Sequence, residues 1–156
     1  MSKKTKMQNH NELWVDITPE MQEIYGAFTP AHPGDAGIDL RSVGPVTLQP
    51  GQTCSIATGV SIKLPTKTEG QVRTKSGLAL KKGLVVLNSP GTIDEGYRGQ
   101  IMVLVHNTSR QIQHIASGDK IAQLVIAKYE RPPVHFRSVT EVISSRGADG
   151  FGSTGN

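Results

Sequence analysis

Short runs of apolar and β-branched residues, separated by turn-forming residues, dominate the chain from Leu13 onward. Such runs cover residues 53–64, 100–106 and 120–129, and in the last one alternate side chains share one face of an extended strand. Glycine and proline supply 17 and 9 of the 156 residues, whereas aromatic residues make up 4%. Many short strands with frequent turns predict an all-β domain, either an antiparallel barrel or a jelly roll.

Helical signals are confined to two places. Thr18, Pro19 and Glu20 supply a cap residue, a proline at the first helical position and an acid in the first turn. Ser76 is a cap candidate before residues 77–82, and Gly83 can close that second helix. We expect neither helix to exceed two turns.

Charge, cysteine content and hydropathy narrow the class of protein. The length is that of one domain, and a single cysteine, Cys54, excludes an internal disulfide, which favours a reducing cytoplasm. No apolar stretch reaches the length of a membrane span, and the net charge of +4 suits an anionic partner. We expect a flexible basic arm over residues 1–12, a β-domain over residues 13–144 and a glycine-rich arm over residues 145–156.

The C-terminal arm places Arg146 and Phe151 among glycines. Two interpretations stay open from composition alone. The arm is a frayed terminus, or it is a lid in which Arg146 pairs with an anion and Phe151 stacks on a flat ring, with hydroxyls donated by Ser153 and Thr154. A ligand with a flat ring and phosphates is a nucleotide.

Three further segments carry candidate chemistry beside an ordinary structural role. Lys75 precedes Ser76 and Gly77 at a helix start, where backbone N–H groups favour an anion. Residues 88–99 predict a hairpin that projects Asp94, either as a turn residue or as a general base on a water molecule. Asp39 lies in a glycine-containing turn and is a candidate for holding Mg²⁺ together with substrate phosphates.

Other kinds of site find little support. The five histidines have no metal-ligand spacing with one another or with Cys54, so a zinc site is not expected. The chain also lacks the GxxxxGK[ST] phosphate loop and the GxSxG elbow.

Five segments, taken in order, resemble the five motifs of the trimeric dUTPase (dUTP pyrophosphatase) family. They are residues 36–40 (AGIDL), 73–79 (RTKSGLA), 91–99 (GTIDEGYRG) with Asn88 ahead of it, 118–124 (GDKIAQL) and 146–155 (RGADGFGSTG). The resemblance implies a distorted jelly-roll β-barrel and a homotrimer, with active sites at subunit interfaces closed by a neighbour's C-terminal arm. It also implies Mg²⁺-dependent hydrolysis of dUTP to dUMP and pyrophosphate, which limits uracil incorporation into DNA and supplies dUMP for dTTP synthesis.

The resemblance also assigns roles to individual residues. Asp94 is expected to activate the attacking water and Asp39 to hold metal-bound water, while Tyr97 lies against the deoxyribose. The uracil edge is expected to meet Asn88 and the backbone of Gly91, Thr92 and Ile93. The phosphate-binding residues are expected to be Lys75, Ser76, Gly77 and Gln123, with Arg146, Ser153 and Thr154 at the γ-phosphate. Phe151 is expected to cover the base, and Gly152 is a further substrate-binding residue.

Some positions depart from the usual family pattern. Thr74 and Lys75 replace a proline and an arginine, and Lys120 replaces an arginine. Gly96 stands where an aspartate is common, and Asp149 where a glycine is common.

Two other functions stay open. A dCTP deaminase would need a glutamate where this chain has Leu104, which disfavours deamination. A regulatory protein that senses dUTP and binds a protein or nucleic-acid partner is the other alternative, suggested by Gly96, Asp149 and the long segment over residues 18–34.

Overall fold

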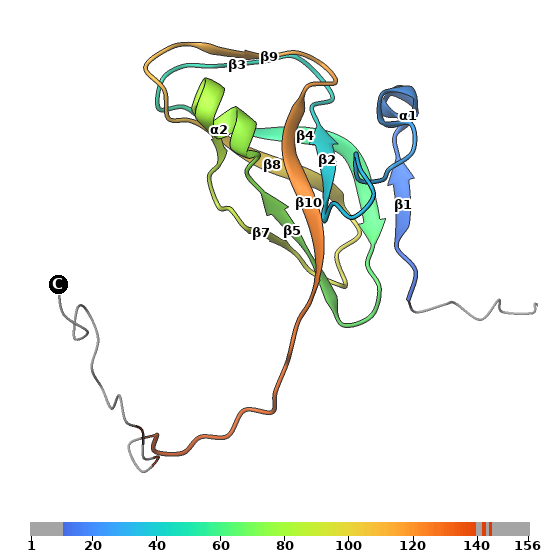
Figure 1. The fold of residues 1–156 in the computed structure, drawn as a ribbon, viewed down its shortest axis with the longest axis vertical. Helices are drawn as coiled ribbons and strands as arrows, with labels where there is room; N and C mark the ends of the chain where they lie inside the picture. Colours follow the sequence, from blue (N-terminus) through green and yellow to red (C-terminus); the bar gives the residue numbers. More distant parts are fainter. Residues whose placement is uncertain (1–10, 140–141, 143, 145–156) are drawn as a thin grey trace, which may run out of the picture.

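The computed structural model describes residues 11–139, 142 and 144, which form ten strands and two short helices (Figure 1). One sheet has the order β1 (Trp14–Ile17), β4 (Thr53–Lys63), β8 (Gln100–Asn107), β6 (Leu84–Val86). The other has the order β2 (Gly37–Arg41), β10 (Lys120–Lys128), β5 (Thr68–Arg73), β7 (Gly91–Ile93). A third pair joins β3 (Val46–Leu48) to β9 (Gln113–Ile115), and every ladder is antiparallel.

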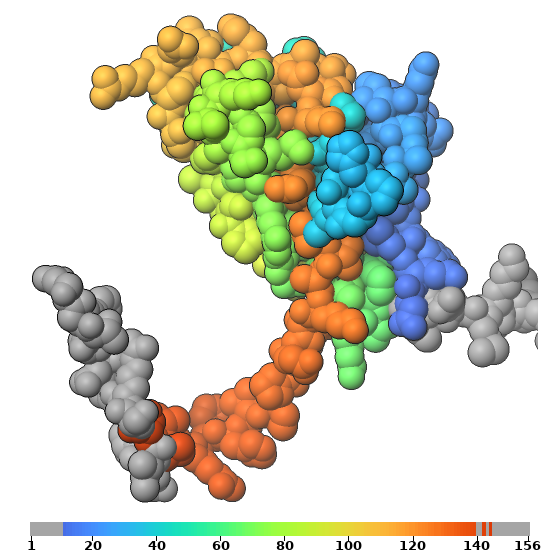
Figure 2. Space-filling model, in the orientation of Figure 1, coloured from blue at the N-terminus to red at the C-terminus, as the bar shows by residue number. Residues whose placement is uncertain are grey.

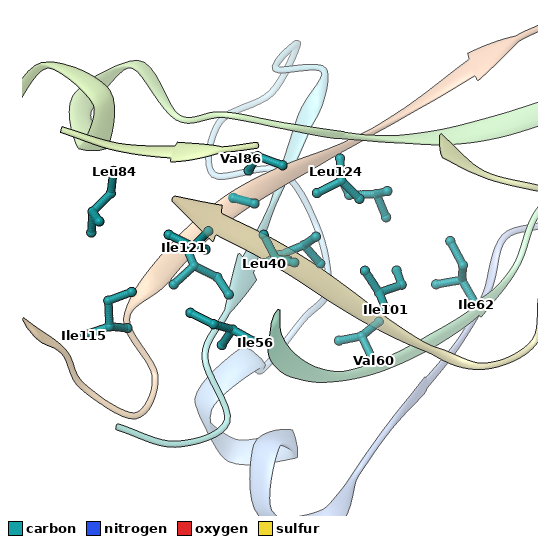
Figure 3. Packing of buried hydrophobic residues seen from close by; sticks show 14 of the residues in the cluster. Leu40, Ile56, Val60, Ile62, Leu84, Val86, Ile101, Ile115, Ile121 and Leu124 are labelled. Atoms are coloured by element: carbon teal, nitrogen blue, oxygen red, sulfur yellow. The ribbon is translucent and has the colours of Figure 1, made fainter. Parts of the chain in front are cut away.

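The two larger sheets enclose one hydrophobic core (Figure 3). In β8 the side chains of Ile101, Val103 and Val105 are buried, and the residues between them are not. Leu40 and Leu124 from the other sheet are fully buried in the same cluster. The predicted all-β, jelly-roll-like fold is confirmed.

The three strands predicted from periodicity are confirmed to within one residue at each end. One of these differences is informative: β8 continues to Asn107. Asn107 is fully buried, and its amide nitrogen donates to the carbonyls of Leu48 and Gln111. A polar residue therefore extends the strand because its hydrogen-bonding groups are satisfied inside the fold.

Both predicted helices are present and each has two turns, α1 (Pro19–Tyr25) and α2 (Ser76–Lys82). Gly83 closes α2 in the left-handed conformation, as predicted. Ser76 is not the cap: it is the first residue of the helix, and Lys75 is the N-cap without a side-chain cap hydrogen bond.

The predicted hairpin over residues 88–99 is wrong in its pairing. Its first arm, β7, pairs with β5, whereas the chain after the turn continues into β8 of the other sheet. The segment is therefore a crossing between sheets, and Asp94 opens its turn by accepting a hydrogen bond from the Tyr97 N–H at 3.0 Å.

Beyond β10 the chain leaves the sheets and runs away from them (Figure 2). Residues 130–139 are all exposed, and the exposed fractions of Val134 and Phe136 are 80% and 100%. Within the described residues, no helix has the length and apolar character needed to cross a membrane.

Candidate functional site

A cluster of charges surrounds Asp39 in the middle of β2. Lys75 contacts one carboxylate oxygen of Asp39, and the Lys120 Nζ lies 2.7 Å from the other. Partial burial raises the pKa of Asp39, but hydrogen bonds from Lys120 and Lys75, with the charges of both lysines, outweigh it and leave the pKa below its usual value. Asp39 is therefore held ionised between two cations.

A β-bulge in β10 brings Lys120 to this cluster. Ala122 pairs with Leu40, yet Lys120 pairs with Arg41, so β10 uses one more residue than β2 over this step. Regular pairing would place Lys120 opposite Ser42 and on the buried face. With the bulge, Lys120 shares the face of Arg41 and Asp39.

Gln123 is the direct partner of Asp39 in the β2–β10 ladder. Its amide nitrogen donates to the Thr74 carbonyl at 3.1 Å, so it ties β10 to the segment that follows β5. Gly37 leaves room for this amide, because a Cβ there would collide with the Gln123 Oε1. The glycine of the first motif thus leaves the space that a side chain of the fourth motif occupies.

Thr74, which stands where the family pattern commonly has a proline, makes hydrogen bonds that fix the segment from Arg73 to Gly77. The Thr74 N–H donates to the Ser89 Oγ, and the Thr74 Oγ1 accepts from the Val86 N–H at 2.8 Å. A proline at this position would have neither group. Ser76 and Gly77 are exposed, and nothing lies within 4 Å of a Cβ at Gly77.

The charged cluster around Asp39 and the Gln123 side chain face a common hollow of about 400 Å³. Its lining includes Gly37, Asp39, Arg73, Lys75, Lys120 and Gln123. The lining carries three cations and an amide against two carboxylates, Asp39 and Asp35, and its excess of positive charge suits a polyanion such as a triphosphate. The predicted phosphate-binding residues Lys75 and Gln123 are therefore brought together.

The predicted base-reading and catalytic segment forms a separate site. Asp94 is exposed and lines a hollow of about 560 Å³ with Glu69, Glu95, Tyr129 and Arg131. Asn88 lies beside Gly91, whose Cβ would be 3.1 Å from the Asn88 Nδ2. Tyr97 is 43% exposed, and its hydroxyl donates to the Gln100 carbonyl, so its ring is held at the surface rather than in the core.

Glu95 secures the turn that carries Asp94. Its carboxylate accepts hydrogen bonds from the Lys67 N–H at 3.0 Å and from the Tyr129 hydroxyl at 2.9 Å. The Lys67 hydrogen bond, followed by that of Tyr129, lowers the pKa of Glu95.

Within one subunit the two sites are apart. Ile93 pairs with Gly70 near the start of β5, whereas Gln123 pairs with Arg73 at its end. Asp94 follows Ile93 and so lies at the level of Glu69, about 13 Å along the strand from Arg73 at ~3.3 Å per residue. Asp94 and the phosphate-binding residues of the same chain do not form one site.

The donor atoms near Asp39 fit a magnesium ion that is bound mainly by substrate. The described residues contain no group of three or more His, Cys, Asp or Glu side chains that could hold a metal ion by themselves. Asp39, already contacted by two lysines, is one of two carboxylates, with Asp35, at the wall of the hollow of about 400 Å³. Mg²⁺ keeps several waters and commonly uses one or two carboxylates with substrate phosphates, so Asp39 suits a water-mediated contact.

Sequence reasoning missed Lys120 as a member of the site, and the C-terminal residues could not be placed. The signal available for Lys120 was its place in the fourth motif, where an arginine is common; the bulge that exposes it is a property of strand pairing and could not be predicted. Arg146, Phe151, Gly152, Ser153 and Thr154 lie outside the described residues.

Comparisons with known proteins agree with this geometry. The family model described as dUTPase matches residues 25–155. A deoxyuridine 5'-triphosphate nucleotidohydrolase of Clostridium kluyveri is 54% identical over 80% of this chain and 87% of its own, and one from Clostridium novyi is 50% identical over the same shares. A dUTPase of Staphylococcus bacteriophage 80alpha, solved with dUpNHpp, has a TM-score of 0.81 at 26% identity, covering 94% of this chain and 99% of that one.

A second solved structure adds a metal. The dUTPase of phage phi11 of S. aureus, described with a structural Mg(II) ion, has a TM-score of 0.72 at 26% identity, covering 81% of this chain and 97% of that one.

Proposed function

Because this chain belongs to the dUTPase family, we propose that it hydrolyses dUTP to dUMP and pyrophosphate with the aid of Mg²⁺. The observation that carries this proposal is the hollow beside Asp39, in which Arg73, Lys75, Lys120 and Gln123 converge. Its cations suit the triphosphate of the substrate named for the relatives.

The active site is shared between subunits of a homotrimer in this proposal. Asp94 and Lys75 of one chain lie at opposite ends of β5, so a substrate whose phosphates meet Lys75 must receive Asp94 from a second chain. The trimer expected for the family supplies such a neighbour. The C-terminal arm, with Arg146 and Phe151, is proposed to close over the assembled site.

Asp94 is proposed to act as the general base. Its carboxylate takes a proton from a water molecule, whose oxygen attacks the α-phosphorus. The bond from the α-phosphorus to the bridging oxygen breaks, and pyrophosphate leaves with the electron pair. Lys75, Gln123 and the exposed N–H groups near Ser76 hold the phosphates, and bound Mg²⁺ supplies further neutralisation of their charge.

Specificity for deoxyuridine is proposed to come from the segment over residues 88–97. Asn88 and the backbone of Gly91, Thr92 and Ile93 read the uracil edge, and a cytosine would leave polar atoms that the bound base covers unpaired, at about 1–3 kcal/mol each. Tyr97, whose ring is fixed by the Gln100 hydrogen bond, excludes a 2′-hydroxyl.

The test is pyrophosphate release from dUTP, dTTP, dCTP and UTP, each with and without Mg²⁺. We expect rapid pyrophosphate release from dUTP and not from the other three nucleotides. The release from dUTP should be lost when Mg²⁺ is chelated. Equal rates with all four nucleotides would contradict the proposal. Release of ammonia from dCTP would instead support deamination, which the aliphatic side chain of Leu104 in β8 disfavours.

A further inference from the structure

The Tyr25 hydroxyl joins the two sheets at the end of the strand that carries Asp39. It accepts a hydrogen bond from the Arg41 N–H at 2.8 Å, in β2, and donates to the Thr58 carbonyl at 3.0 Å, in β4. Thr58 is itself fully buried, and its own hydroxyl donates to the Ile101 carbonyl at 2.7 Å. One oxygen atom therefore links β2 to the most buried part of the opposite sheet.

Tyr25 has little freedom to move. Its ring packs edge to face against Phe28, with centroids 5.6 Å apart. It ends helix α1, which is anchored by Met21 with 1% exposure and by the Thr18 N–H bound to the Gly59 carbonyl. Gly59 has a φ of +71°, and its missing Cβ leaves the space that Met21 fills.

The backbone that Tyr25 holds belongs to the Asp39 cluster. Arg41 lies two residues beyond Asp39 on the same face of β2, and it is the register partner of Lys120. The Arg41 guanidinium also donates to the Gly118 carbonyl at 2.8 Å, which fixes the turn before Lys120. A shift of Arg41 therefore moves both Asp39 and one of its two lysines.

We propose that Tyr25 is a positioning residue for triphosphate binding, whose hydroxyl fixes the end of β2 so that Asp39 holds Lys75 and Lys120 at the phosphate hollow. The hydrogen bonds of the Tyr25 hydroxyl go to Arg41 and Thr58, so it acts on the cluster through Arg41. This inference rests on the proposed function for the identity of the ligand. It also gives a role to the segment over residues 18–34, which the phosphate and base contacts leave unused.

Tyr25→Phe tests the proposal because it removes the hydroxyl and keeps the ring. We expect the affinity for the non-hydrolysable triphosphate α,β-imido-dUTP with Mg²⁺ to fall about tenfold by calorimetry, a change of ~1.4 kcal/mol. The affinity for dUMP, which lacks the β- and γ-phosphates, should change less than about twofold. Hydrogen exchange at the Arg41 amide should become faster, since that N–H loses its acceptor.

Thr47→Val is the matched control. It removes a side-chain hydroxyl that contacts the His114 Nδ1 on the small β3–β9 sheet, away from Asp39, and should leave both nucleotide affinities unchanged. If Tyr25→Phe does not accumulate as folded protein, Phe28→Leu is the second variant, because it removes the aromatic contact that holds the Tyr25 ring. The loss of α,β-imido-dUTP affinity and the faster exchange of the Arg41 amide are then both expected, but smaller.

The outcomes separate the two proposals. Unchanged α,β-imido-dUTP affinity in a folded Tyr25→Phe variant overturns the positioning role, whatever the exchange rate at Arg41. An equal loss of dUMP affinity also overturns it, because the effect is then not specific to the phosphates. Failure of the unmodified protein to bind α,β-imido-dUTP instead counts against the proposed function.

Discussion

Asp94 and Lys75 lie at opposite ends of strand β5, because the strand before Asp94 pairs near Gly70 and Lys75 follows Arg73. In the proposed trimer, a substrate that contacts both residues therefore bridges two chains. This arrangement permits a complementation experiment between two inactive variants.

Mixed trimers of Asp94→Asn and Lys75→Ala should regain activity that neither variant has alone. After subunit exchange, about a quarter of the sites combine an intact Asp94 from one chain with an intact Lys75 from another. Pyrophosphate release from dUTP measures the recovery, with each variant refolded alone as the control. No recovery in demonstrably mixed trimers would place both residues in one chain's site.

Asp94→Asn should lower turnover of dUTP by about 10²- to 10⁴-fold, the usual contribution of a general base. Asparagine keeps the shape of the side chain but cannot take a proton, so the dissociation constant for dUTP should change little. Single-turnover kinetics and calorimetry separate the two quantities. Glu23→Gln, which alters an exposed carboxylate on α1, is the control, and a near-normal rate in Asp94→Asn would exclude the assigned role.

Gly37→Ala should weaken phosphate binding with little effect on stability, because the flexible Gln123 side chain can move aside. The added Cβ would push the Gln123 amide from its place beside the Thr74 carbonyl. KM for dUTP and the free energy of unfolding are the measurements. Gly44→Ala adds a Cβ with nothing within 4 Å and should change neither; if both variants behave alike, Gly37 is not needed for the Gln123 contact.

Asp39 should make stability depend on pH in the acid range. Its pKa is lower in the folded state than the ordinary 3.8, so its contribution is present above that value and is lost as pH falls through the folded pKa. Asp39→Asn should cost about 1 kcal/mol at neutral pH, and the difference from the unmodified protein should shrink below about pH 4.

Thermal unfolding across pH measures this difference. Asp16→Asn, on the exposed face of β1, should show no such convergence. A constant gap between Asp39→Asn and the unmodified protein down to the acid limit would contradict the ion-pair account.

Deleting residues 146–156 should lower turnover and leave the melting temperature nearly unchanged. The arm is proposed to close over the site and exclude water, whereas the described core is assembled from residues of the two sheets. Circular dichroism confirms the fold and pyrophosphate release reports the rate. Full activity of the shortened chain would remove Arg146 and Phe151 from the proposed site.

Local patterns in the sequence were sufficient for three of the ten strands of the described residues, β4, β8 and β10, and for both helices. The alternation in β8 and β10 and the Pro19 and Gly83 signals each act within a few residues, so their structural outcome was predictable. The partner of β7 was not, because residues 91–93 could pair with any nearby edge, and the fold selects β5.

The sequence also predicted some residues of the candidate site and missed others. The motif residues Asp39, Lys75 and Gln123 converge as the resemblance implies. Lys120 joins them only through a bulge, and a one-residue change in register leaves no mark on the hydrophobic pattern of Ile121 and Ala122, both buried. The role of Tyr25 depends on a contact between residues 33 positions apart, Tyr25 and Thr58, which no local pattern records.

The pairing of Lys75 and Lys120 with Asp39 also defines what a nucleotide must do on arrival. Both ammonium groups share one counter-charge, the Asp39 carboxylate, so incoming phosphates compete with that carboxylate for the lysines and do not fill a bare cationic pocket. The free site therefore carries less excess charge than its number of cations suggests. Binding should consequently depend less steeply on salt than it would for a site of unpaired lysines.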